Sequence, residues 1–97
     1  MKIIYHYLFQ EALKEIVKYI AKDKKSASIS FNKNLKQQIK DIPNNPLKYV
    51  KSGYFNDSNV RDMTYMGYTI IYEINFKNNS IEMLKIFNRN KLPSMKD

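Results

Sequence analysis

The chain has 97 residues, the length of a single domain, and its 43% hydrophobic content with only 2 Gly and 3 Pro excludes intrinsic disorder. It contains no Cys and a single His, which excludes a disulfide framework, a thiolate metal site and a multi-histidine metal site. The formal net charge of +8 favours a polyanionic partner, namely nucleic acid, the ribosome, an anionic membrane or an acidic protein, over lysines that only solvate the surface.

The first eight residues predict a strand. From Lys2 to Leu8 apolar side chains fall on both faces, which is typical of a strand at the centre of its sheet. His6 lies within this segment, and we expect it to be packed and hydrogen-bonded instead of catalytic. The segment lacks the apolar run of a signal peptide, and no stretch of the chain is apolar enough to span a membrane. We therefore expect a cytoplasmic protein.

Two amphipathic helices follow the strand. Apolar residues recur at helical spacing from Phe9 to Ile20, and a short polar break then places Asp23 or Ser26 to cap a second helix. Pro43 ends this helix because proline has no backbone N–H and its ring clashes with the preceding turn. A break this short predicts an antiparallel helical hairpin.

The second half of the chain predicts a loop and three strands. Residues 41–59 hold two Pro, a Gly and several Asn, which indicates a loop. Strands are expected at residues 60–66, 68–76 and 81–88, with turns at Gly67 and at residues 77–80. The order β-α-α-β-β-β predicts one α+β domain over residues 1–97, with a helical hairpin on one face of a mostly antiparallel four-stranded sheet.

The candidate binding residues are basic, since the sequence shows no cofactor or metal motif and no Ser-His-Asp set. Arg61 and Arg89 are the only two arginines, and both lie at expected strand ends. In a lysine-biased chain this placement suggests bidentate contact with phosphate or carboxylate, although an ion pair of Arg61 with Asp57 explains one of them equally well. With Lys51 and Lys91, these arginines are our candidate contacts to a target or to nucleic acid.

Five segments of the chain carry a family resemblance. They are residues 13–23, Ala27 with Phe31, residues 43–46, residues 60–63 with 67–72, and residues 83–89. In this order and topology they resemble the RelE/ParE superfamily of toxins. These are the toxins of type II toxin-antitoxin systems, and they include plasmid stabilisation toxins. The helical hairpin is closer to the ParE-like branch.

The resemblance implies a growth-inhibiting toxin that a cognate acidic antitoxin wraps and neutralises. Its target is DNA gyrase or, in the nuclease branch, messenger RNA on the ribosome, for which Arg61 and Arg89 match the catalytic arginine positions. The chain departs from that branch, because Asn88 replaces a common His, Thr69 replaces a frequent Arg, and no Tyr or His follows Phe87. We therefore favour gyrase, with RNA cleavage as the alternative and an inactive member that binds only nucleic acid or an antitoxin as a second alternative.

Overall fold

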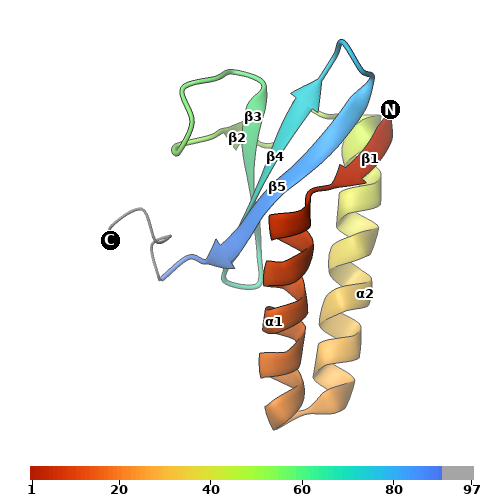
Figure 1. The fold of residues 1–97 in the computed structure, drawn as a ribbon, viewed down its shortest axis with the longest axis vertical. Helices are drawn as coiled ribbons and strands as arrows, with labels where there is room; N and C mark the ends of the chain where they lie inside the picture. Colours follow the sequence, from red (N-terminus) through yellow and green to blue (C-terminus); the bar gives the residue numbers. More distant parts are fainter. Residues whose placement is uncertain (91–97) are drawn as a thin grey trace.

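The computed structural model describes residues 1–90, which form a helical hairpin packed on one face of a five-stranded sheet (Figure 1). The elements in chain order are β1 (Lys2–Tyr5), α1 (Tyr7–Asp23), α2 (Lys25–Asp41), the 3-10 turn η1 (Ile42–Asn44), β2 (Val50–Lys51), β3 (Val60–Tyr65), β4 (Tyr68–Asn75) and β5 (Ser80–Asn88). The predicted α+β class is confirmed. Within residues 1–90, neither helix is long and apolar enough to cross a bilayer.

The sheet is mixed and has the strand order β1-β5-β4-β3-β2. β1 runs parallel to β5, and the other neighbouring strands are antiparallel. The expected count of four strands is wrong, because Val50 and Lys51, within the expected loop, pair with β3. The expected central position of the first strand is also wrong: β1 is an edge strand that ends at Tyr5, since Tyr7 and the residues after it already belong to α1.

The two helices form the predicted antiparallel hairpin, with Lys24 as the only residue between them (Figure 1). Lys24 has an extended backbone, and its side chain makes no capping hydrogen bond. The expected cap is therefore wrong, because Asp23 ends α1 and Ser26 already lies in the first turn of α2. Pro43 acts as predicted, since α2 ends at Asp41 and the proline lies in η1.

The core lies between the hairpin and the sheet. It is formed by buried side chains of both helices and of β3, β4 and β5, among them Phe9, Leu35, Ile39, Met63, Ile70, Tyr72, Ile74 and Met83. β4 ends at Asn75, so Phe76, which was expected within this strand, lies beyond it and is exposed.

The opposite face of the sheet is partly covered as well. Thr69 and Ile71 point away from the helices and are nevertheless buried. The loop between β2 and β3 reaches this face, where the ring of Tyr54 packs edge-on against Phe87 at 5.3 Å between centroids. This loop therefore belongs to the folded body of the protein.

Candidate functional site

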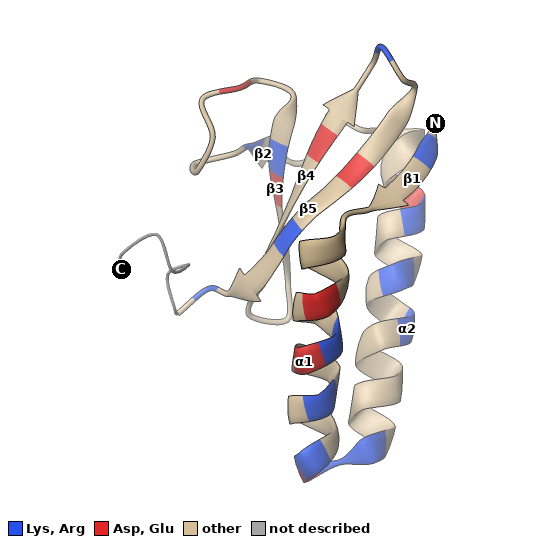
Figure 2. Cartoon of the chain, viewed as in Figure 1, with Lys and Arg blue, Asp and Glu red and all other residues tan. Residues whose placement is uncertain are grey.

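A groove of about 450 Å³ lies between α1 and α2. Its apolar lining comes from Tyr5, Phe9, Leu13 and Val17, and its cationic lining comes from Lys14, Lys18 and Lys36. The Lys36 ammonium sits 5.0 Å from the centroid of the Tyr5 ring, a distance at which a cation is attracted to an aromatic face. Lysines of both helices follow the hairpin in Figure 2. We refer to these residues as the hairpin groove, which suits an apolar segment that also carries carboxylates.

Arg61, at the start of β3, binds the loop that precedes its strand. Its Nε donates a hydrogen bond to the carbonyl of Ser58 at 3.1 Å, and its Nη1 donates to the carbonyl of Tyr49 at 3.0 Å. Lys51 is its register neighbour on β2, so these two candidates do lie together. Within the described residues, Arg61 forms no ion pair with Asp57, which was the alternative for this arginine. The guanidinium instead links the residue before β2 to the end of the loop between β2 and β3.

Tyr72, the partner of Arg61 on β4, also contacts the segment that precedes β3. Its hydroxyl donates a 2.6 Å hydrogen bond to the carbonyl of Pro46, and its ring meets that of Tyr49 edge-on. Burial raises the pKa of Tyr72 to about 12, although the positive charge of Arg61 opposes the shift. The phenol therefore remains a neutral donor at physiological pH. The contact of Tyr72 with the loop was not visible in the sequence.

Arg89 lies at the other end of the sheet. Its side chain is exposed, and its backbone N–H donates to the carbonyl of Gly67 at 2.9 Å. Arg61 pairs with Tyr72, whereas the last pair of β5 joins Asn88 to Tyr68, four residues away along β4. This separation is roughly 13 Å at the rise of a strand. The structure therefore does not bring the two arginines together, and Lys91 lies outside the described residues.

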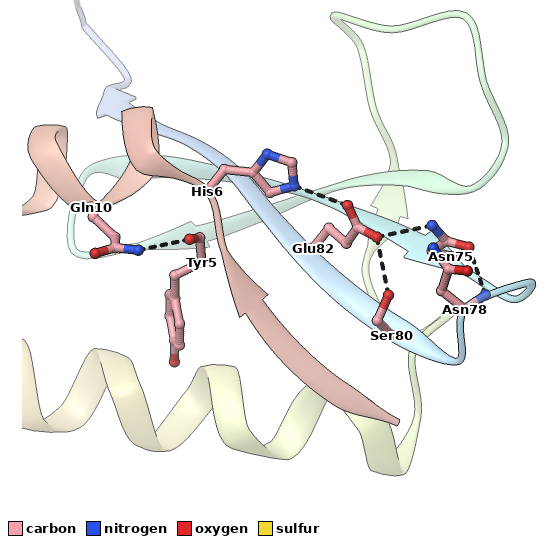
Figure 3. A network of polar contacts seen from close by, with 7 residues as sticks. All are labelled: Tyr5, His6, Gln10, Asn75, Asn78, Ser80 and Glu82. Carbon is pink, nitrogen blue, oxygen red and sulfur yellow. Dashed lines mark hydrogen bonds and ion pairs between the residues drawn. The ribbon is translucent and has the colours of Figure 1, made fainter.

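A polar network joins β1 to the β4–β5 hairpin (Figure 3). The Nε2 of His6 lies 2.9 Å from Oε1 of Glu82, whose Oε2 accepts hydrogen bonds from Asn75 and Ser80. The bond from His6 is the main cause that holds the pKa of Glu82 below its ordinary value. His6 is thus hydrogen-bonded as expected, but with 44% of its side chain exposed it is not packed in the core.

A family model described as the ParE toxin of the type II toxin-antitoxin system parDE matches residues 3–93 of the chain. The match extends from within β1 to beyond β5, so it spans the hairpin and the rest of the sheet. No curated protein gives a significant match.

Proposed function

Since the chain belongs to the ParE toxin family of type II toxin-antitoxin systems, we propose that it inhibits growth in the cytoplasm by acting on DNA gyrase. One observation supports gyrase over RNA cleavage. Arg61 and Arg89 lie at opposite ends of the sheet, and Arg61 directs its guanidinium at loop carbonyls. Stabilising a phosphoryl transition state requires cationic groups around one phosphate, which this arrangement of the two arginines does not provide.

The same basic residues fit a broad protein interface better than a single phosphate site. We retain Lys51, Arg61, Arg89 and Lys91 as proposed contacts with the target. Charges spread over an interface accelerate association and favour complementary partners without converging on one atom. Reversal of the exposed charges at Lys51 and Arg89 should therefore weaken gyrase inhibition, whereas reversal at Lys77, in the β4–β5 turn, should not.

The hairpin groove supports the proposal that the neutralising antitoxin is acidic. Its apolar lining offers contact area to one face of a bound segment, and Lys14, Lys18 and Lys36 offer charge to carboxylates on that segment. The net charge of +8 adds a long-range attraction that accelerates encounter with an acidic protein. The antitoxin would thus be recognised by its charge and held by apolar burial.

The test is a supercoiling assay with purified protein, purified gyrase and relaxed plasmid. We expect loss of supercoiling, and in induced cells we expect DNA synthesis to fall before protein synthesis. Intact supercoiling with early collapse of translation and cleaved messages would overturn the gyrase proposal in favour of RNA cleavage. Intact supercoiling and normal growth would identify an inactive member of the family.

A further inference from the structure

An apolar patch surrounds Tyr68, at the end of the sheet near the β3–β4 turn. Tyr68 separates two hollows, one of about 360 Å³ against α1 and one of about 430 Å³ against α2. The apolar residues that line these hollows include Tyr19, Ile20, Met66, Tyr68, Ile86 and Phe87, and we name this surface the Tyr68 patch. It shares no lining residue with the hairpin groove, so it is a separate surface.

The Tyr68 patch differs in charge from the rest of the surface. Among residues 1–90, none of those that line its two hollows is Lys or Arg, and Glu15 is the only charged one. In Figure 2 the β3–β4 turn is likewise free of basic colour. Lys22 lines a neighbouring hollow together with Tyr19, so positive charge lies at the margin of the patch. On a chain of net charge +8, this is a surface to which an acidic partner has little to bind.

The patch contains both projections and hollows. The side chains of Tyr19 and Met66 are 71% and 73% exposed, and each lines one of the two hollows. A two-fold interface uses the same surface of both subunits, so it requires projections and matching hollows on one patch. The margin is complementary too, since Glu15 of one copy can face a marginal lysine of the other.

Contacts within the fold also hold the base of the patch in place. The ring of Phe31 packs edge-on against Tyr65 and Tyr68, at 5.1 Å and 5.5 Å between centroids, and the hydroxyl of Tyr65 donates to the carbonyl of Phe31. The backbone N–H of Arg89 fixes the turn by its bond to Gly67. A surface that is already ordered loses less conformational entropy on association.

We propose that the Tyr68 patch is the interface of a homodimer, with a second copy of this chain as its occupant. Two copies of net charge +8 repel each other, and they associate most favourably where the described residues of neither copy place a lysine or arginine in the hollows. The hairpin groove stays open in such a dimer, so each copy can still bind an antitoxin. The inference does not depend on the identity of the toxin's target.

The proposal is tested by sedimentation velocity and light scattering on the purified full chain, from low to high micromolar concentration and at several salt concentrations. We expect a species of twice the monomer mass. Its dissociation constant should decrease as salt is added, because screening weakens the repulsion between copies while apolar contact persists. A chain that remains monomeric under all these conditions would overturn the proposal.

Variants locate the interface. Met66→Lys and Tyr19→Lys each place a charge in the seam of both copies, and we expect each to weaken dimerisation at least about tenfold. Phe76→Lys is the matched control, because Phe76 is also apolar and exposed but follows β4 at the opposite end of the sheet. Far-ultraviolet circular dichroism and thermal unfolding check that all three variants fold. If Phe76→Lys weakens the dimer as strongly as Met66→Lys and Tyr19→Lys do, the interface lies elsewhere. If the wild-type chain is monomeric and the two patch variants lose antitoxin binding, the patch binds the antitoxin and not a second copy.

Discussion

The Nε2 of His6 lies 2.9 Å from Oε1 of Glu82, and this contact ties the residue after β1 to the first half of β5 (Figure 3). β1 is an edge strand of four residues, so few backbone hydrogen bonds hold it in the sheet. Glu82 also accepts from Asn75 and Ser80, which anchors the contact to the β4–β5 hairpin. The network therefore stabilises the position at which α1 leaves the sheet.

We expect this network to make stability depend on pH. The pKa of Glu82 is lower in the folded chain than in the unfolded chain, chiefly because of the bond from His6. The unfolded chain thus binds more protons near the ordinary Glu pKa of about 4.3, so the free energy of unfolding falls as pH decreases from about 5 to about 3. Urea unfolding across this range should show a shallower decrease for Glu82→Gln than for the wild type. Glu11→Gln, on the exposed surface of α1, is the control and should leave the slope unchanged.

Arg61 should prove to be a positioning residue for its loop. Arg61→Ala removes the hydrogen bonds to the carbonyls of Ser58 and Tyr49, and we expect a loss of about 1.5 to 3 kcal/mol in the free energy of unfolding, the range for hydrogen bonds that involve a charged group. Arg61→Lys retains the charge but not the planar fork, so it should recover only part of the stability. Chemical unfolding measures the free energy of unfolding of both variants. Arg89→Ala, at an exposed position, is the control. Wild-type stability in Arg61→Ala would show that the guanidinium does not hold the loop.

Most of the fold could be predicted because it depends on local patterns. Apolar spacing located both helices, and Pro43 and Gly67 located the end of α2 and the β3–β4 turn. The misassigned first strand shows the limit of this reasoning. A central strand with two buried faces and a short strand that continues into a helix give the same kind of apolar segment in a sequence. Only the pairing of β1 with β5 in the structure shows that β1 is an edge strand.

The candidate sites were harder to predict because they depend on contacts between distant residues. His6 and Glu82 are 76 positions apart, and no local signal links them. Arg61 and Arg89 were recognised as strand-end residues, but their separation follows only from the antiparallel register of β3, β4 and β5. Tyr65 is a further case, because its burial and its hydrogen bond to the carbonyl of Phe31 involve a helix 34 positions away in the sequence.

Tyr72 should contribute to the loss of stability at alkaline pH, together with Tyr5, Tyr65 and Tyr68, whose pKa values burial also raises. Its pKa of about 12 lies above that of an unfolded tyrosine, so the unfolded chain loses its proton first and stability declines as pH rises from about 10 toward 12. Tyr72→Phe removes the bond to Pro46, and we expect a loss of about 1 kcal/mol at neutral pH. Tyr7→Phe, at an exposed position, should have no comparable effect. Ultraviolet titration of the phenols should show one late-ionising tyrosine fewer in Tyr72→Phe, and an unchanged titration would contradict the assignment.

The β3–β4 turn requires a glycine at one position. Gly67 has a φ of +85°, and the preceding Met66 also has a positive φ, of 50°. Gly67→Ala meets no steric neighbour within 4 Å, so its cost is backbone strain alone, which we expect to be about 1 kcal/mol. Gly53→Ala is the matched control, because its backbone is not in the left-handed region and its added Cβ meets only Asp62 at 3.9 Å. Equal thermal stabilities of the two variants would show that the turn relaxes without strain.

The lysines of the hairpin groove should determine antitoxin affinity independently of toxicity. Lys14→Glu and Lys36→Glu each replace attraction to an acidic segment by repulsion. At low salt we expect each variant to lose about 1 kcal/mol of binding free energy, which raises the Kd for the antitoxin roughly fivefold. Titration calorimetry with the purified cognate antitoxin should show this loss shrinking as salt is added, and Lys77→Glu should bind normally. Neither groove residue is among the proposed target contacts, so both variants should still inhibit gyrase. Variants that no longer bind the antitoxin but still inhibit gyrase would show that antitoxin and target bind different surfaces. Equal losses of antitoxin binding and gyrase inhibition would mean that the two partners share one surface.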